Sequence, residues 1–206
     1  MLFNIKDIEY SIDNNVIIDR QNLKINEGQH LLLLGPSGCG KTTLLNIMSG
    51  LLKPDSGELS YRCDIYSSFS DNKLDRLRAK NFGFIFQKIH LIRHLTVAQN
   101  IAISQMKPNP TKVQELVNDL GLNGKENQKA KDLSVGEAQR VAIARAVANN
   151  PKVIFADEPS SALDNANTEK VINLIFSQAK KTNATVIAST HDARIKAHFK
   201  TILELA

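Results

Sequence analysis

The sequence has few of the features on which secreted, membrane-spanning or disulfide-bonded proteins depend. It contains two cysteines, Cys39 and Cys63, and no tryptophan among its 206 residues. Its apolar runs are short pieces such as Leu31–Leu34, whereas a membrane-spanning helix needs roughly 18 apolar residues. The first residues, Met1–Asp7, lack the basic start and long apolar core of a signal peptide. We therefore expect a cytosolic protein without disulfides, whose contact with any membrane is peripheral.

Aromatic residues are also scarce, and the positive charge is modest. Phenylalanine, tryptophan and tyrosine make up 5% of the chain, and the formal net charge is +5. The densest basic patch consists of Lys73, Arg76, Arg78, Lys80, Lys88 and Arg93. Aromatic side chains are not interleaved with this patch, which argues against a stacking platform for single-stranded nucleic acid. The patch is either a solvated face or a surface that approaches anionic lipid headgroups or an acidic partner.

The clearest signal is a glycine-rich stretch between an apolar run and an apolar helix start. It reads Gly35-Pro36-Ser37-Gly38-Cys39-Gly40-Lys41-Thr42-Thr43. A buried strand, a glycine turn and a helix N-terminus form the context of a phosphate-binding loop, because backbone N–H groups and the helix dipole favour an anion there. We predict that Lys41, as an exposed loop lysine, reaches the phosphates and that the Thr42 hydroxyl helps to hold Mg²⁺. Alone, the stretch predicts only a nucleoside triphosphate, since GTPases, kinases and motors share it.

Around this loop, short apolar strands alternate with helices. Residues 2–26 form apolar pieces broken by a turn at 13–15, which predicts a small N-terminal antiparallel sheet. Further strands are predicted at 58–65, 82–87, 153–156 and 185–188, and helices at 41–50, 74–80, 138–149 and 168–181. This alternation implies right-handed crossovers and a parallel sheet with ligands at the carboxyl ends of its strands. We expect one α/β domain, 1–206, with the fold of a P-loop NTPase.

The middle of the chain has a helical pattern. Thr96 is a predicted cap for the helix 97–104, and a second amphipathic helix over 113–120 stops at Gly121. We therefore predict a helical subdomain, approximately 88–135, inserted in the α/β core. Its first residues, 88–95, carry four large apolar side chains without a helical or strand period. They either fold into the helical part or line a groove that receives a short helix of a partner.

Polar residues follow the predicted parallel strands at the edge where a ligand would bind. Asp157 and Glu158 come directly after the strand 153–156, and His191 follows the strand 185–188. Asp157 is suited to hold Mg²⁺ directly or through water, and Glu158 is suited to act as the general base on the attacking water. An Asp-Glu pair at a strand end is usually a solvated turn. Together with the phosphate loop, it predicts a hydrolytic site.

These motifs together resemble the nucleotide-binding domain of ABC ATPases over nearly the whole chain. Six stretches match in order: the phosphate loop 35–43, Gln87, Leu133-Ser134-Val135-Gly136-Glu137, Asp157-Glu158, Ser161-Ala162-Leu163-Asp164 and His191. The phosphate loop is widespread, whereas the stretch 133–137 followed by 139–146 is specific to this superfamily. The resemblance implies the ABC ATPase fold and an ATPase that uses ATP and Mg²⁺.

The resemblance further implies a homodimer whose two protomers enclose two ATP molecules head to tail. In it, Ser134 and Gly136 of one protomer meet the γ-phosphate held by Lys41 of the other. A helix N-terminus at Ser134 suits an anion on physical grounds alone, although Ser134 is also consistent with a plain helix cap. Within each protomer, Gln87 contacts Mg²⁺ and water, and His191 hydrogen-bonds the γ-phosphate.

Two details of this resemblance concern the dimer contact and the adenine. Asp164 is the residue expected to set the dimer contact. Tyr10 is the nearest aromatic candidate for stacking on the adenine, but counting back from residues 16–19 places Ile12 at the family's usual position. Residues 10 and 12 share one face of a strand, so either side chain could cover the base.

Further details of the sequence resemble one branch of the ABC ATPases, namely those of lipoprotein-release and macrolide-efflux systems. Leu74–Arg78 before Phe82–Gln87, and the stretch 189–195, carry this likeness, while Val135 and Glu137 depart from the commonest signature and 159–164 departs from the branch. The branch implies membrane permease subunits as partners, a peripheral position on the inner face of the cell membrane, and no nucleic acid. The chain ends soon after His191, so no regulatory extension is expected.

Two other function classes compete with this assignment. A soluble ABC ATPase acting on ribosomes or DNA usually carries a second ATPase domain, long coiled coils or metal hooks, which do not fit in 206 residues. A kinase built on the same loop would need an acceptor site and a lid, and it would leave the stretch 133–137 unexplained. ATP consumption without a phosphorylated product separates the kinase from the transport ATPase.

Overall fold

The computed structural model describes residues 1–159 and 165–205. A five-stranded parallel sheet has the order β6-β7-β8-β3-β9, with β3 (Leu31–Leu34), β6 (Phe82–Ile85), β7 (Val153–Asp157), β8 (Thr185–Thr190) and β9 (Thr201–Glu204). A four-stranded antiparallel sheet has the order β2-β1-β4-β5, with β1 (Phe3–Ile12), β2 (Asn15–Ile25), β4 (Ser56–Tyr61) and β5 (Asp64–Ile65). The predicted parallel core and N-terminal antiparallel sheet are confirmed.

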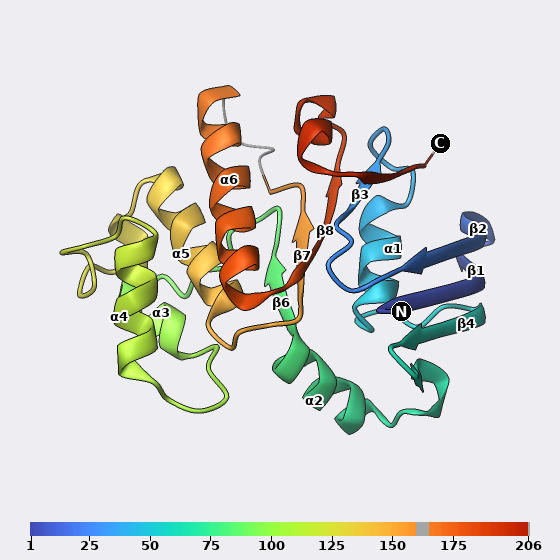
Figure 1. The fold of residues 1–206 in the computed structure, drawn as a ribbon, viewed down its shortest axis with the longest axis horizontal. Coiled ribbons are helices and arrows are strands. Elements are labelled where there is room, and N and C mark those ends of the chain that lie inside the picture. Colours follow the sequence, from blue (N-terminus) through green and yellow to red (C-terminus); the bar gives the residue numbers. More distant parts are fainter. Residues whose placement is uncertain (160–164, 206) are drawn as a thin grey trace.

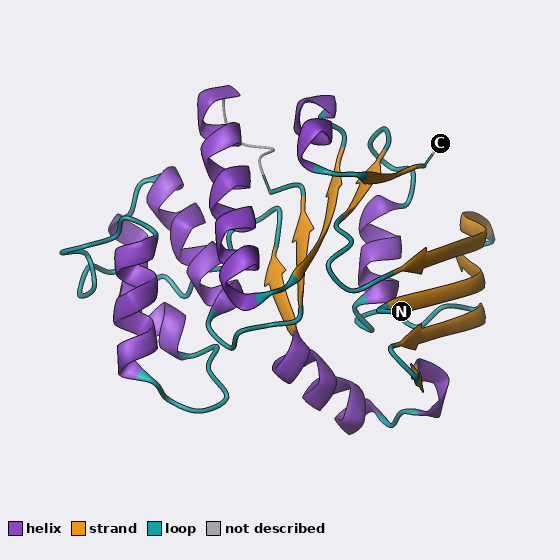
Figure 2. Ribbon diagram, viewed as in Figure 1, coloured by secondary structure: helices purple, strands orange, loops and turns teal. Residues whose placement is uncertain are grey.

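Helices cover the parallel sheet on both faces. The α-helices of the described residues are α1 (Lys41–Met48), α2 (Asp71–Asn81), α3 (Val97–Ala102), α4 (Pro110–Asp119), α5 (Val135–Val147) and α6 (Asn165–Thr182), of which α2 leads into β6 and covers neither face. Helix α1 lies between the parallel sheet and the antiparallel sheet, whereas α3 to α6 lie on the opposite side (Figure 1). Colouring by secondary structure shows the two sheets separated by α1 (Figure 2). None of the helices in the described ranges is both long and apolar enough to cross a bilayer.

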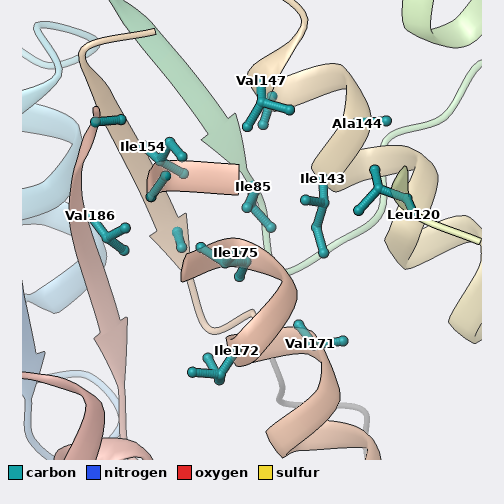
Figure 3. Close-up of a cluster of buried hydrophobic side chains, with 14 of the residues drawn as sticks. Ile85, Leu120, Ile143, Ala144, Val147, Ile154, Val171, Ile172, Ile175 and Val186 are labelled. Carbon is teal, nitrogen blue, oxygen red and sulfur yellow. The ribbon is translucent and has the colours of Figure 1, made fainter. Parts of the chain in front are cut away.

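The apolar strands are buried on both faces, because their successive side chains point to opposite sides of the sheet and both sides are covered by other elements. In β3, Leu31 and Leu33 join the core beneath α1, whereas Leu32 and Leu34 join the core beneath α5 and α6. The second core packs Ile154 of β7 and Val186 of β8 against both helices (Figure 3). A continuous apolar run, as opposed to an alternating one, therefore marks the central strands.

The helices between β6 and β7 follow the predicted signals. Thr96 caps α3 and forms a capping box with Gln99. Helix α4 ends just before Gly121, whose φ of +63° belongs to the left-handed region that glycine adopts without strain. Leu91 packs against the core shared by these helices and the sheet. This contact agrees with the first of the two alternatives for 88–95, in which these residues fold into the helical part.

Several predicted boundaries were wrong, each for a local reason. The expected strand 58–65 is two strands, because Arg62 has a φ of +57° and turns the chain. Strand β6 ends at Ile85, so Gln87 lies beyond it. Helix α5 begins three residues earlier than position 138, because Ser134 caps it. Helix α2 extends from 71 to 81, and β9 was not predicted.

Strand β6 and helix α5 meet in direct backbone contact at Gly83. A Cβ atom on Gly83 would lie 2.1 Å from the carbonyl oxygen of Ala146, much closer than any real contact allows. Only glycine fits this approach. The contact fixes the strand that leads to Gln87 against the helix that begins at Ser134.

Candidate nucleotide-binding and hydrolysis site

The carboxyl ends of four neighbouring strands, β6, β7, β8 and β3, carry the polar residues singled out in the sequence. A cavity of about 260 Å³ opens at this edge. It is lined by Ser37, Gly38, Gly40, Lys41, Thr42, Thr43, Gln87, Glu158 and His191. Segments more than 100 residues apart in the sequence thus meet here because parallel strands end on the same side of the sheet.

The glycine-rich loop connects β3 to α1 and leaves the helix N-terminus facing the cavity. Gly40 occupies the cap position of α1 with a φ of +89°. A Cβ on Gly40 would lie 2.9 Å from the carbonyl oxygen of Ile17, so the loop sits directly against β2. At Gly35, a Cβ would lie 2.3 Å from the carbonyl oxygen of Leu205. The first backbone N–H groups of α1 are free to receive an anion.

Lys41 is buried, contrary to the exposed position expected from the sequence. Its side chain is only 6% exposed, and its Nζ donates hydrogen bonds of 2.8 Å to the carbonyl oxygens of Gly35 and Pro36. The same Nζ lies 3.9 Å from Oε1 of Glu158. The ammonium group therefore rests on the loop's own carbonyls, next to the carboxylate across the cavity.

Thr42 and Asp157 form an oxygen cluster suited to a hard cation. The Thr42 hydroxyl lies 3.0 and 3.1 Å from the two carboxylate oxygens of Asp157, and the Ser189 hydroxyl donates to the same carboxylate. Hydroxyl and carboxylate oxygens are the ligands that Mg²⁺ prefers. Among the residues with described positions, no group of three or more His, Cys, Asp or Glu could hold a metal. A magnesium ion at this pair would need phosphate oxygens or water to complete its shell.

Glu158 is held in an unusual backbone conformation beside the loop. Its φ is +46°, a value that non-glycine residues rarely adopt, and its backbone N–H donates to the Ser189 carbonyl at 3.0 Å. The residue is 9% exposed. Oε2 accepts a hydrogen bond of 3.1 Å from the Thr190 hydroxyl, and Oε1 lies 2.9 Å from Nδ1 of His191. The carboxylate is therefore bracketed by partners on both oxygens.

Ser134 and Gly136 lie away from this cavity. The exposed Ser134 caps α5: its hydroxyl accepts from the Glu137 N–H at 3.4 Å, and its own N–H donates to Glu137 Oε2 at 2.9 Å. The Lys125 ammonium and the Ser134 N–H lower the pKa of Glu137 to about 2. A Cβ on Gly136 would meet only the Arg140 side chain, at 3.7 Å. Ser134 is thus the N-terminal cap of α5. Because this helix end lies outside the cavity of its own chain, it could contact only a phosphate bound by a second chain.

The residues proposed for adenine stacking also lie outside the cavity lining. Tyr10 is partly buried and packs against the core beneath α1. Ile12, on the same strand, is 48% exposed. The expected dimer contact at Asp164, with Ser161–Leu163 before it, lies outside the residues that the structure describes.

Two residues that hydrogen-bond the candidate catalytic carboxylates, Ser189 and Thr190, were not predicted from the sequence. Both are fully buried at the end of β8, and their hydroxyls bond Asp157 and Glu158 respectively. The available signal was the change from apolar to hydroxyl side chains within the strand run 185–190. That signal is weak, because serine and threonine at a strand end usually bond the nearest backbone.

Comparison with known proteins decides which kind of phosphate-loop protein this is. Residues 18–161 match the family model described as ABC transporter. The chain belongs to the ABC transporter family. It is 38% identical over 177 residues to the lipoprotein-releasing system ATP-binding protein LolD of Saccharophagus degradans, covering 83% of this chain and 78% of LolD. The macrolide export ATP-binding/permease protein MacB of Salmonella choleraesuis is 40% identical over 190 residues, which cover 89% of this chain and 29% of MacB.

Solved structures of the same family match the whole fold. MJ0796, described as a bacterial ABC transporter cassette with a dimeric structure, superposes with a TM-score of 0.88 at 32% identity, over 99% of this chain and 94% of that one. The same cassette is known as a dimer bound to ADP and phosphate, with a TM-score of 0.87. This member of the ABC transporter family is therefore an ATP-binding subunit and an ATPase. Its predicted likeness to the lipoprotein-release and macrolide-efflux branch is confirmed, and these relatives lend no support to a ribosome- or DNA-directed ATPase.

Proposed function

We propose that two copies of this protein, on the cytoplasmic face of the membrane, bind and hydrolyse ATP with Mg²⁺ to drive separate permease subunits. The observation that carries the proposal is the cavity in which the phosphate loop, Gln87, Glu158 and His191 meet. Phosphate-binding, metal-binding and water-activating groups are thus within reach of one triphosphate.

Binding of the triphosphate replaces contacts that the loop makes with itself. The Lys41 ammonium leaves the Gly35 and Pro36 carbonyls and turns to the β- and γ-phosphate oxygens, while the N–H groups at the start of α1 donate to the same phosphates. Thr42, Asp157 and Gln87 would hold the magnesium ion. When bound, Mg²⁺ neutralises the charge that develops on the phosphate oxygens.

Glu158 acts as the general base for the attacking water. Its carboxylate takes a proton from the water as the water oxygen bonds to the γ-phosphorus. The bond between this phosphorus and the bridging oxygen breaks, and its electron pair stays on ADP. His191, which now lies against Glu158 Oε1, turns its ring to the γ-phosphate when ATP is present. Burial of Glu158 keeps bulk water from competing for the carboxylate.

The second protomer completes the site by offering the start of α5. Ser134 is exposed, Gly136 is approached only by the Arg140 side chain, and neither residue lines its own chain's cavity. In a head-to-tail dimer, this helix N-terminus meets the γ-phosphate bound by the partner, which agrees with the dimeric state of the similar cassette MJ0796. Asp164 is proposed to set the dimer contact. The adenine lies along the β1–β2 hairpin, against Tyr10 or the more exposed Ile12.

A separate groove of about 400 Å³ suits a permease helix. Its lining includes the apolar residues Leu51, Phe84 and Phe86 and the polar residues Ser104 and Asn149. Apolar anchors with a polar rim fit a short amphipathic helix. Phe86 immediately precedes Gln87, so a docked helix would contact the segment that leads into the hydrolytic cavity. The joint name of MacB, an ATP-binding/permease protein, supports a permease as the occupant.

The test is the variant Glu158→Gln, which keeps shape and hydrogen bonding but removes the base. We expect ATP binding to persist and the turnover rate to fall by about 10²–10⁴. Because the ATP-bound closed state then accumulates, ATP should convert monomers into dimers on a sizing column. The matched control is Glu169→Gln, an exposed α6 residue that pairs with His198. Wild-type turnover by the folded Glu158→Gln protein would overturn the assignment of the base.

A further inference from the structure

The Thr190 hydroxyl makes two hydrogen bonds whose directions are fixed by chemistry. Its Oγ1 accepts a hydrogen bond of 3.0 Å from the backbone N–H of Asp192, and an N–H group can only donate. The hydroxyl proton is then directed to Oε2 of Glu158, 3.1 Å away. Thr190 is fully buried, so water does not compete for either bond. The side chain thus acts as a donor of known direction to one oxygen of the carboxylate.

The two oxygens of Glu158 have different surroundings. Oε1 faces the cavity, because it lies 3.9 Å from the Lys41 ammonium and 2.9 Å from the His191 ring nitrogen. Both of these partners line the cavity and have phosphate oxygens to bind once ATP arrives. Oε2 points into the protein towards Thr190, which does not line the cavity. Thr190 is therefore the side-chain partner of Glu158 that keeps its contact when the others turn to the nucleotide.

The end of β8 also holds the backbone of Glu158. The Ser189 carbonyl accepts the Glu158 N–H at 3.0 Å, which supports the strained φ of +46°. In the register of the sheet, Asp157 faces Ser189 across β7 and β8. The backbone contact sets where the side chain starts, and the Thr190 hydroxyl sets how the carboxylate is rotated.

We propose that Thr190 is a positioning residue for ATP hydrolysis: it anchors Oε2 of Glu158 so that Oε1 receives the proton of the attacking water. This inference rests on the proposed role of Glu158 as the base. A carboxylate without this anchor would rotate about its terminal bond, and fewer collisions with the positioned water would be productive. Thr190 acts through Glu158 and makes no contact with the nucleotide.

The test compares Thr190→Val, which preserves shape but lacks the hydroxyl, with Thr190→Ser, which keeps the hydroxyl. For Thr190→Val we expect kcat to fall roughly tenfold to a hundredfold, the range for losing a hydrogen bond to a charged group. The KM for ATP should change less than about twofold, because phosphate and metal contacts are intact. Thr190→Ser should restore kcat to within about threefold of wild type. If the valine variant does not fold, Thr190→Ala removes the same hydroxyl and carries the same expectation.

A matched control lies on the same strand. Thr185 is also buried, its hydroxyl accepts from the Gly28 N–H at 2.9 Å, and neither residue lines the cavity. Thr185→Val should lower the unfolding temperature much as Thr190→Val does, yet leave kcat unchanged. Equal losses of kcat in both variants would reveal a general stability effect and overturn the proposal. So would a folded Thr190→Val protein with kcat within twofold of wild type.

The Glu158→Gln variant distinguishes the positioning role of Thr190 from the proposed role of Glu158 as the base. If Glu158→Gln is slow, adding Thr190→Val should slow it little further, because both changes disable the same carboxylate. Full additivity would overturn the positioning role while leaving the base assignment intact. If Glu158→Gln alone turns over normally, the base assignment itself has failed, whatever Thr190→Val does.

Discussion

Lys41→Met isolates the charge of the phosphate-loop lysine, because methionine keeps much of the aliphatic stem and loses the ammonium. In the wild-type protein, this ammonium donates to the carbonyl oxygens of Gly35 and Pro36. Leaving a buried carbonyl without a donor costs about 1–3 kcal/mol. Both carbonyls lie on a partly open loop that water can reach, so the low end applies, about 1–2 kcal/mol in total. For a chain of this length, 1 kcal/mol corresponds to about 2–4 °C in unfolding temperature.

The effect on ATP should be larger than the effect on the fold. Losing a hydrogen bond between the ammonium and a phosphate costs about 1.5–3 kcal/mol, which is roughly a tenfold to 150-fold rise in Kd. Calorimetric titration with ATP and Mg²⁺ measures the Kd, and scanning calorimetry measures the unfolding temperature. Lys170→Met, on the exposed face of α6, controls for loss of one positive charge. A Lys41→Met protein that binds ATP within threefold of wild type would refute this account of the loop.

Three further predictions follow from the α5 region. Ser134→Arg should block hydrolysis in its own homodimer. An equimolar mixture of the Ser134→Arg and Lys41→Ala proteins should recover ATPase activity, because one composite site of the mixed dimer is intact. No recovery, or loss of ATP binding to the Ser134→Arg monomer, would contradict the head-to-tail dimer. Lys125 and the Ser134 N–H lower the pKa of Glu137 to about 2, so the ionised carboxylate contributes to the free energy of unfolding above the unfolded pKa of about 4.5, and this contribution declines towards pH 2. The difference in free energy of unfolding between wild type and Glu137→Gln, measured by urea unfolding, should therefore shrink between pH 6 and pH 3. Gly83→Ala should destabilise the fold by about 1–3 kcal/mol through overpacking against α5, and an unchanged unfolding temperature would show that β6 and α5 separate easily.

The site could be predicted from the sequence wherever chemistry follows from strand order. The apolar runs at 31–34, 153–156 and 185–188 are buried on both faces, so they had to be central parallel strands. Residues just after them then share one edge, and Asp157, Glu158 and His191 indeed come together with the phosphate loop. This part of the prediction needed only the pattern of apolar residues in the sequence and the geometry of parallel sheets.

Other features depend on tertiary contacts that leave little trace in the sequence. All residues of α2 stay at least partly exposed, so its true length has no apolar period to reveal it. Within the described residues, strand β9 pairs with β3 alone, and its residues alternate between partly exposed and exposed. The burial of Lys41 arises because carbonyls of its own loop satisfy the ammonium. A loop lysine looks the same in the sequence whether it faces solvent or the chain.

The position of the last described residues matters for how the protein is prepared. Leu205 donates its N–H to the Leu34 carbonyl, and its own carbonyl lies against Gly35, at the entrance to the phosphate loop. A purification tag fused after β9 would therefore emerge beside the nucleotide site. A polyhistidine tail there brings imidazoles that compete for the metal and crowd the triphosphate. Cloning the tag in front of the exposed Met1 keeps the kinetic measurements free of that artefact.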